Sequence, residues 1–332
     1  MNSSVSERAA NRWKVHRLCG LALFIFFGAH DANTQAAMAQ NKTHHGVQPY
    51  ITVNFPTSAV GEYQILKPGK LYSDDLPQSG LKPAKGTVNI PASYRLALIL
   101  NYFGRTNIDL LKSIPVPLLR SLALANMEVD NGTFQQLLHF TDLVSLDMSG
   151  TDVNDGGTKG LRNLTKLQKL DIGFCPIGLA TVEEISNLKN LLRLQFASST
   201  LGEKAMPPLV KLKQLKVLVL STTRMTDSCV TQISKLSELE ELGLAHNNIT
   251  DQCIDSILKL KHLRRINLAD TKVTFSGLMK LNALPALKYL LLRKNTLSSE
   301  QLAKLQARLP KVTLEEGTRA KDYDPELFGP IH

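Results

Sequence analysis

Two aspartates in this 332-residue chain stand at a spacing that could bring their carboxylates together. Asp147 and Asp171 lie 24 residues apart, each inside a short alternation of apolar and polar residues that is typical of a β-strand. If the two strands pair in parallel as neighbours, equivalent side chains lie about 4.8 Å apart. Two carboxylates at that distance are unfavourable without a cation or a basic partner. The pair therefore marks one end of a candidate binding surface.

Basic and aromatic side chains occupy equivalent positions toward the C-terminal end of the chain. Tyr and Arg are favoured anchors in interfaces, and His246 could add a pH-dependent contact. We predict a groove that is acidic at one end and basic and aromatic at the other, the alternative being ordinary solvated side chains. Besides the two aspartates, the residues predicted to bind a partner are Phe174, Arg193, Val219, His246, Arg264, Arg265, Lys288, Tyr289, Leu291, Arg293 and Lys294.

No arrangement of residues indicates catalysis. The chain contains no G-x-S-x-G, P-loop, H-E-x-x-H or paired C-x-x-C motif. His44 and His45 lie in a polar stretch without further metal ligands. We predict a protein that is not an enzyme and that holds neither a cofactor nor a metal ion.

An internal repeat of 24 residues positions the candidate side chains. The pattern Leu-x-x-Leu-x-Leu recurs, with conservative replacements, in eight copies that begin at residues 119, 143, 167, 191, 215, 239, 263 and 287. Counting from the first Leu, positions 1, 4, 6, 11, 16, 19 and 22 are apolar at 54 of 56 sites, the departures being Thr158 and Arg308. In a chain with 43% hydrophobic residues, about 24 sites would be apolar by chance.

The two halves of the repeat predict different elements. Positions 4 and 6 alternate with polar or small residues, as in a β-strand with one buried face. Positions 16, 19 and 22 are three residues apart, which places them on one face of a helix or 3₁₀ turn. One strand and one helix cannot bury these faces alone, so the copies must stack. We predict an α/β solenoid whose parallel strands present positions 2, 3, 5, 7 and 8 on a concave surface.

The repeat resembles the leucine-rich-repeat family. The segment LEELGLAHNNI (239–249) carries the L-x-x-L-x-L strand, followed by polar residues and an aliphatic one. The pairs Thr226-Asp227 and Thr250-Asp251 look like the variant with a Thr-Asp turn before the helix, where Asp is expected to cap the helix N-terminus. The resemblance implies a horseshoe-shaped solenoid. It says little about function, because the family binds diverse ligands.

The four cysteines are too few for a scaffold built on disulfides. Cys175 stands at position 9, where the family frequently has Asn, and we expect it to pack in the core. Cys229 and Cys253 share position 15 of neighbouring repeats. Both a disulfide between them and simple packing beside the helices remain open.

Residues 1–39 have the order of a secretory signal peptide. Basic residues between Arg8 and Arg17 precede an apolar run over 18–29, and small residues follow up to Ala39. The run is shorter than the ~20 residues that span a bilayer. We predict cleavage after Ala39 and secretion or location in the cell envelope, with an uncleaved membrane anchor at 18–29 as the alternative. Cleavage would leave 35 basic and 27 acidic residues, a net charge of +8 in place of +10.

The rest of the chain divides around the repeats. We predict a linker at 40–47 and a β-rich region at 48–117 that caps the first repeat. Within this region, 51–55, 62–66, 86–90 and 94–100 have β-type composition between Pro and Gly breaks. The repeats and a last partial strand occupy 118–316, and 317–332 is expected to be a loose tail.

These features predict an exported, non-catalytic leucine-rich-repeat protein that binds a protein or peptide through its concave face. One alternative is a substrate-recognition adaptor of an enzyme complex, since Thr-Asp repeats resemble those of ubiquitin-ligase substrate receptors. Another is an envelope or wall component that binds anionic polymers. The mild positive charge does not indicate nucleic acid, and membrane contact is expected only through an uncleaved N-terminal segment.

Overall fold

The computed structural model describes residues 49–68, 80–101, 104, 108–199, 201–292 and 297–315. The predicted signal peptide, the linker at 40–47 and the tail at 317–332 lie outside these residues, as do Arg293 and Lys294. None of the helices in the described ranges has both the length and the apolar character needed to cross a bilayer.

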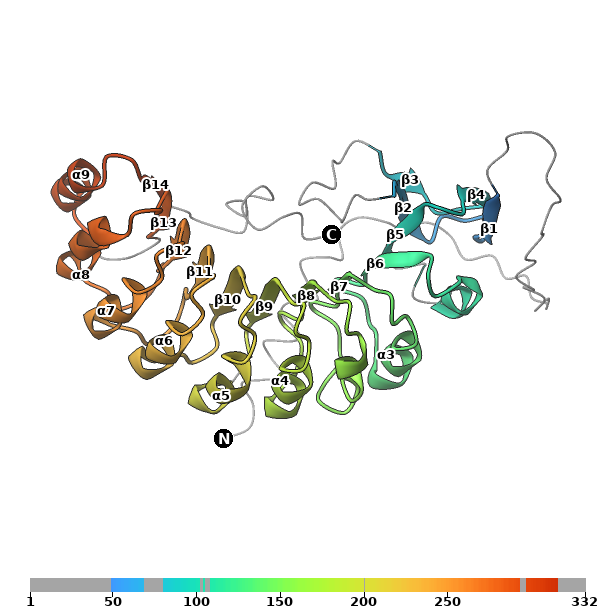
Figure 1. Ribbon diagram of the computed structural model, residues 1–332, viewed down its shortest axis with the longest axis horizontal. Helices are drawn as coiled ribbons and strands as arrows, with labels where there is room; N and C mark the ends of the chain where they lie inside the picture. Colours follow the sequence, from blue (N-terminus) through green and yellow to red (C-terminus); the bar gives the residue numbers. More distant parts are fainter. Residues whose placement is uncertain are drawn as a thin grey trace, which may run out of the picture. The chain divides into compact units, whose positions relative to one another are not determined.

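The repeats stack their strands into one long parallel sheet (Figure 1). Neighbouring strands pair residues 24 positions apart, so that Leu146 lies between Leu122 and Leu170. Each repeat position therefore forms a row across the sheet. In chain order the strands are β5 (Arg95–Leu100), β6 (Leu119–Ala123), β7 (Ser145–Asp147), β8 (Lys169–Asp171), β9 (Arg193–Ala197), β10 (Val217–Ser221), β11 (Glu241–Gly243), β12 (Arg265–Asn267), β13 (Tyr289–Leu291) and β14 (Thr313–Glu315).

Short helices connect the strands and lie on the outer side of the sheet (Figure 1). They are short because strand, turn, helix and return must all fit within one repeat. The α-helices are α3 (Asn131–Leu137), α4 (Leu179–Ile185), α5 (Met206–Leu209), α6 (Asp227–Ile233), α7 (Ile254–Ile257), α8 (Phe275–Met279) and α9 (Ser299–Arg308). The 3₁₀ segments are η2 (Leu161–Asn163), η3 (Glu203–Ala205), η4 (Asp251–Cys253) and η5 (Lys280–Ala283).

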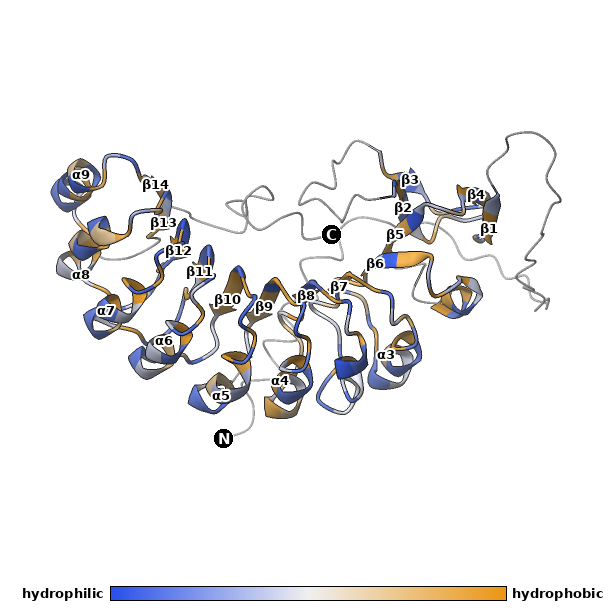
Figure 2. Cartoon of the chain, viewed as in Figure 1, coloured by the Kyte–Doolittle hydropathy of each residue, from blue (hydrophilic) through white to orange (hydrophobic). Residues whose placement is uncertain are grey.

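The apolar positions of the repeat form a continuous core between the sheet and the helices (Figure 2). In the fifth repeat, Leu218 and Leu220 from the strand and Val230 from the helix are fully buried. Each such aliphatic side chain contributes about 1.5–3 kcal/mol when removed from water. The ladder of leucines therefore supplies the packing that a chain with few aromatic residues needs.

The two departures from the apolar pattern have separate reasons. Thr158 is fully buried, and its hydroxyl lies 2.8 Å from Thr181 Oγ1, so the polar group is satisfied inside the core. Arg308 is exposed at the end of α9, where Leu305 and Leu309 are buried instead. Neither residue disturbs the stacking.

The N-terminal region adds antiparallel strands to the same sheet. β1 (Tyr50–Asn54) and β4 (Thr87–Pro91) form a separate antiparallel pair. β2 (Gly61–Leu66) pairs antiparallel with β3 (Lys82–Pro83) and β5, and β5 pairs in parallel with β6. The 3₁₀ helix η1 (Ile108–Ser113) links β5 to the first repeat. The four strands expected here lie within one residue of their predicted bounds.

Position 8 takes the left-handed backbone conformation in all seven repeats described there, with φ between 52° and 68°. The chain turns away from the strand at this point. For residues other than glycine this conformation costs about 1–2 kcal/mol. A bulky residue at position 8 therefore needs a reason beyond the fold. The residues are Asn126, Gly150, Phe174, Ser198, Thr222, His246 and Asp270.

The side chain at position 9 forms hydrogen bonds with backbone groups beneath this turn. Asn247 Oδ1 accepts the N–H groups of Thr223 and Met225, and its Nδ2 donates to the Leu220 carbonyl. Local bonds replace the asparagine in other repeats. Thr151, Thr223 and Thr271 donate to the position-6 carbonyl of their own repeats, and Cys175 donates to that of the preceding repeat.

Aspartates at position 13 link neighbouring repeats. Asp227 accepts the backbone N–H and the hydroxyl of Thr250 at 2.8 and 2.9 Å. Asp251 accepts the same two bonds from Thr274 at 2.7 and 2.6 Å. The expected helix cap by these aspartates is therefore wrong, because the cap residue is the threonine one place earlier. Gly277 leaves room for the second link, since a Cβ there would collide with Asp251 Oδ1.

Asp251→Ala should lower the free energy of unfolding by about 1–2 kcal/mol, because Thr274 loses a charged acceptor for two donors. Asp255→Ala removes an exposed carboxylate from the following turn and makes the same charge change. This control should cost about 0.5 kcal/mol or less. Urea unfolding measures both variants, and equal losses would show that the link adds nothing to stability.

Candidate functional site

The aspartates of the predicted groove accept hydrogen bonds from the turns that follow their strands. Asp147 Oδ1 accepts the backbone N–H and the hydroxyl of Ser149 at 2.9 and 2.7 Å. Asp171 and Asn267, at the same repeat position, also accept the N–H two residues later. These bonds satisfy donors at the point where the chain leaves the strand. In β9 and β10, where this position is Gln or Val, the paired strands run two residues further.

The two carboxylates lie at partner positions of β7 and β8. Burial raises the pKa of Asp147 to about 7, and the charge of Asp171 adds to the rise. Burial also raises the pKa of Asp171, against hydrogen bonds from Gly173 and Gln195 and the positive charge of Arg193. Asp147 is only 8% exposed, and its Oδ2 has no hydrogen-bond partner within the described chain. The acidic end is thus a partly buried titrating pair with basic and amide neighbours.

At the other end of the groove, the Arg265 guanidinium lies over the ring of Tyr289 on the neighbouring strand. The Arg265 guanidinium carbon lies 4.1 Å from the centroid of the Tyr289 ring, and Arg265 is 3% exposed. A desolvated cation over an aromatic face contributes about 2 kcal/mol. Tyr289 and its strand neighbour Leu291 remain half-exposed. Arg265 therefore positions the ring, while Tyr289 is accessible to a partner.

The middle of the sheet presents smaller features. Arg193 and Val219 are half-exposed on β9 and β10. A Cβ at Gly243 would lie 3.0 Å from Val219 Cγ1, so the glycine lets the valine lie close to the next strand. His246 is exposed, and its Nε2 lies 3.3 Å from Asp270 Oδ2 in the next repeat. Protonation of His246 would turn this contact into an ion pair.

An open cleft of about 390 Å³ lies at the start of the last strands. Arg264, Lys288 and Lys311 bring three cations to it, beside Tyr289. Arg264 lies 3.6 Å from Glu240, whereas the two lysines make no ion pair with a described residue. The cleft therefore favours an anionic group.

The third repeat exposes apolar side chains within 174–180, a segment that ends in the first residues of α4, and we call this segment the apolar loop. Phe174 is 52% exposed and Leu179 is 38% exposed, with the exposed Pro176 between them. The sequence prediction included Phe174 but missed the other two. The feature of the sequence that could have identified the whole segment is the uncharged stretch FCPIGLA (174–180), in which Leu179 takes position 13 of the repeat. Four other repeats have an acidic residue there, namely Asp155, Glu203, Asp227 and Asp251.

The cysteines in the described ranges are buried free thiols. The disulfide considered between Cys229 and Cys253 is therefore not formed, and both pack beside the helices. Burial raises the pKa of the Cys253 thiol to about 12 and also raises that of Cys175. These two thiols are thus held in the protonated, unreactive form.

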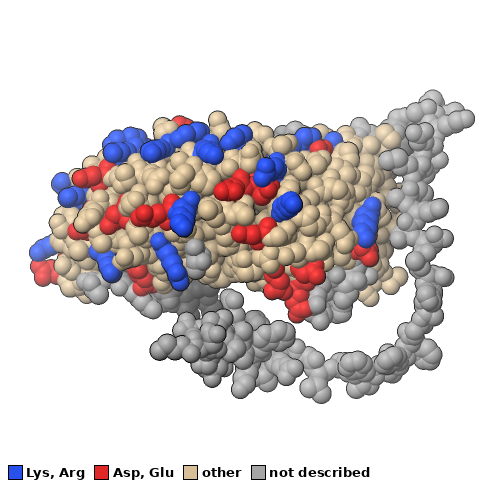
Figure 3. Space-filling view, turned by 90° about the horizontal axis from the view of Figure 1, so that it is seen from below, with Lys and Arg blue, Asp and Glu red and all other residues tan. Residues whose placement is uncertain are grey.

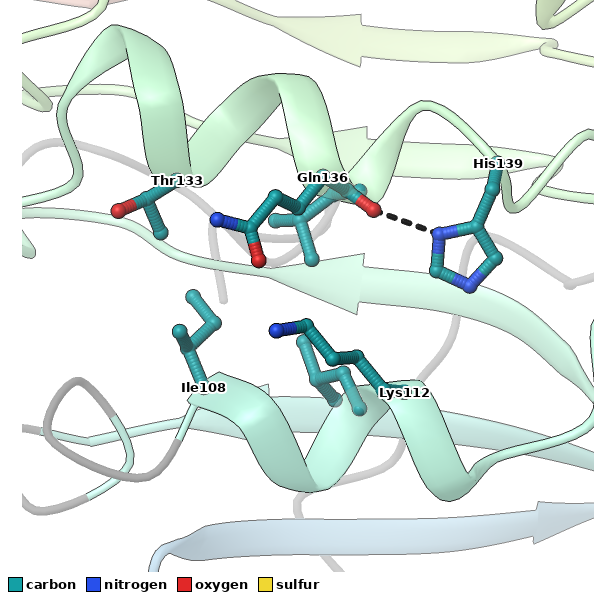
Figure 4. Close-up of a pocket in the computed structure, with 7 residues that line it drawn as sticks. Ile108, Lys112, Thr133, Gln136 and His139 are labelled. Atoms are coloured by element: carbon teal, nitrogen blue, oxygen red, sulfur yellow. Dashed lines mark hydrogen bonds between the residues drawn. The ribbon is translucent and has the colours of Figure 1, made fainter.

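A narrow gap between η1 and α3 brings His139 and Lys112 into one region (Figure 4). His139 Nδ1 lies 2.6 Å from the Gln136 carbonyl oxygen, and Lys112 pairs with Asp109 at 2.5 Å. The gap has essentially no free internal volume. It is an ordinary packing space between two helices. Across the described residues, no three His, Cys, Asp or Glu side chains are grouped so that they could hold a metal ion.

Comparison with solved structures identifies the architecture. An internalin (inlF) from Listeria monocytogenes matches with a TM-score of 0.51 and 22% identity, over 68% of this chain and 60% of that one. The fold is a leucine-rich-repeat solenoid. The internalin C2 of the same organism matches with a TM-score of 0.48 and 24% identity, over 60% and 82% of the chains. A leucine-rich-repeat protein of Leptospira interrogans matches at 0.43 and 22%, over 60% and 62%.

These likenesses concern the fold. The chain spans 60% of the length of the first internalin, and identities of 22–24% carry no information about a shared ligand. No protein-family model matches the chain, and no curated protein sequence does. The function of this leucine-rich-repeat chain must therefore be argued from its own surface.

Asp147→Asn should remove a pH-dependent loss of stability from the leucine-rich-repeat solenoid. The pKa of Asp147 is about 7 in the folded chain, above its ordinary value of 3.8, so unfolding releases a proton between these values. The free energy of unfolding should therefore fall as pH rises through this window, by about 1.4 kcal/mol per pH unit at most. Urea unfolding at about pH 5 and about pH 8 measures the fall.

The control is Asp152→Asn, which changes an exposed aspartate a few residues away. It should keep the wild-type dependence on pH, whereas Asp147→Asn should weaken this dependence and leave the part that comes from Asp171. Identical dependence in all three proteins would mean that Asp147 is ionised in the folded chain at low pH.

Proposed function

We propose that the chain is an exported, non-catalytic leucine-rich-repeat protein that binds a protein or peptide. Its binding surface comprises the concave rows of β8–β13 together with the apolar loop. The surface offers apolar and aromatic groups held on a rigid sheet, which suits recognition of another chain.

Phe174 is the observation that carries this proposal. It exposes about half of its surface at a left-handed backbone position, with φ 61°, that favours Gly or Asn. The backbone conformation is costly for a bulky residue, and about half of the apolar side chain still faces solvent. A bulky apolar residue kept at such a position is expected where it contacts a partner.

The surroundings of Phe174 indicate what such a partner offers. Leu179 and Pro176 extend the apolar surface. In the flanking repeats, the position of Leu179 carries Asp155 and Glu203. An apolar centre with a charged rim is the usual anatomy of a protein interface. The fitting partner therefore presents an apolar side chain flanked by basic residues.

The far end of the concave face supplies a second set of contacts. Tyr289 is held by Arg265, and Leu291 lies two residues further along the same strand. A ring that is already fixed loses little conformational entropy on binding. Val219 contributes a smaller apolar contact midway along the sheet. We propose that one extended partner reaches both ends.

Phe174→Asn should weaken binding of the partner while it raises the stability of the chain. Removal of the strained residue should raise the free energy of unfolding by about 0.5–1 kcal/mol, because Asn tolerates the left-handed conformation. Affinity for the partner should fall about 30-fold, as expected for a central aromatic anchor. Urea unfolding measures the first effect. Capture of extracellular proteins on the immobilised chain identifies the partner, and titration measures the second effect.

Tyr50→Thr is the matched control, because Tyr50 is equally exposed but lies outside the repeats. It should capture the same partner as the wild type. Retention of that partner by Phe174→Asn would remove the apolar loop from the interface.

Export is the second part of the proposal and rests on residues 1–39. Their basic, apolar and small segments support cleavage after Ala39. Sequencing the N-terminus of the native protein should find Gln40 as the first residue. Met1 in its place would favour the membrane anchor at 18–29.

A further inference from the structure

Charge is sorted between the two edges of the repeat sheet. Eight segments that lead from a helix into the next strand contain twelve Lys or Arg and three Asp or Glu residues. The segments that leave the strands on the opposite edge contain three basic and nine acidic residues within the described ranges. The first set is 139–144, 163–168, 187–192, 211–216, 235–240, 259–264, 283–288 and 307–312. The second is 126–132, 150–156, 174–180, 198–199 with 201–204, 222–228, 246–252, 270–276 and 297–300.

We call the first edge the basic edge. All twelve of its cations are exposed, and in the outer view of Figure 3 Lys and Arg side chains gather along one long margin. They are Lys166, Lys189, Lys211, Lys213, Lys216, Lys235, Lys259, Lys261, Arg264, Lys288, Arg308 and Lys311.

Most of these cations lack a carboxylate partner. Lys166 pairs with Asp142, and Lys216 and Arg264 share Glu240. The other nine make no ion pair with any residue in the described ranges. The edge therefore keeps a net positive potential that an anionic partner could neutralise.

Helix stability accounts for only part of this pattern. Lys211, Lys235 and Lys259 share position 21, just after the ends of α5, α6 and α7, where a cation interacts favourably with the helix dipole. At position 23, Lys189 also serves a helix end, because it donates to the Ser186 carbonyl at the C-cap of α4. At position 2, Lys216, Arg264 and Lys288 directly precede β10, β12 and β13, where the helix dipole contributes little. The cations at position 2 are therefore not explained by the helix ends.

The basic edge also leads to the cleft of about 390 Å³ described above. Arg264, Lys288 and Lys311 line this cleft and belong to the edge. The edge thus combines a long band of positive charge with a recess that can receive an anionic group.

We propose that the basic edge binds a linear, sulfated polysaccharide that lies across the repeats and places one anionic group in the cleft. Lysine provides compact, mobile charges that suit sulfates spaced along a flexible chain. Tyr289 is the aromatic residue at the cleft, so the edge lacks the series of rings on which bases stack. The large hydrophobic residues that the described chain exposes (Tyr50, Phe174 and Leu179) lie elsewhere, which disfavours insertion into a membrane.

Heparin is the probe for this surface. A triple variant of the full-length protein, Lys211→Glu with Lys235→Glu and Lys259→Glu, reverses one row of the basic edge. The control, Lys204→Glu with Arg224→Glu and Lys272→Glu, makes the same charge change at exposed residues of the opposite edge. At about 0.15 M salt, the first variant should bind immobilised heparin at least about 30-fold more weakly, and the control less than about 3-fold.

The dependence on salt supplies a second readout. Each cation that contacts the polymer adds roughly 0.7–0.9 to the slope of log Kd against log salt, so the edge variant should lose about two. The corresponding Lys→Gln triple variant should lose a similar slope, and its thermal melting checks that the fold is intact. Phe174→Asn should leave heparin affinity unchanged, because it alters a separate surface.

Three results would overturn the proposal. Equal loss of affinity in the edge variant and its control would assign binding to net charge. Binding of duplex DNA as tightly as heparin would show that the surface does not select a polysaccharide. Tighter binding to anionic phospholipid vesicles than to heparin would assign the edge to a membrane.

Discussion

Parallel pairing in a constant register of 24 residues is the constraint on which the rest of this structure depends. Because each strand residue pairs with the residue one repeat away, a repeat position keeps the same environment across the sheet. The apolar residues at positions 4 and 6 then face the helices, and position 8 turns left-handed in each of the seven repeats where it is described. A slip of one residue would expose every buried leucine of a strand, so the apolar pattern itself enforces the register.

The same register places side chains of like charge beside one another. The consequences differ between the buried row at position 5 and the exposed row at position 21. In the row at position 5 the register stacks Asp147 on Asp171, where little water reaches them, and burial raises the pKa of both. The fold accepts this cost because each carboxylate satisfies a turn N–H. At position 21 it aligns exposed lysines, whose repulsion water and salt screen. Rows of like charge can therefore persist on the outer edge and become a surface for a polyanion.

Departures from the repeat are more informative about function than the repeat itself. The third repeat lacks an acidic residue at position 13 and instead exposes Leu179, with Phe174 nearby on the left-handed turn. Neither choice helps the stacking, since Asp227 and Asp251 at the same position link their repeats to the next. The apolar loop thus exposes apolar side chains within a regular framework, which is typical of a contact surface.

The sequence by itself determined the solenoid, because a strict period of apolar residues leaves one way to bury both halves of the repeat. It also located the four cap strands between their Pro and Gly breaks. Only the tertiary structure decided how deeply each polar side chain is buried and which residues it contacts. It buried Asp147, placed the Arg265 guanidinium over the Tyr289 ring, and joined Asp227 to Thr250 of the following repeat. Periodicity states which face a side chain occupies, but burial and hydrogen bonding depend on neighbours that folding brings from other repeats.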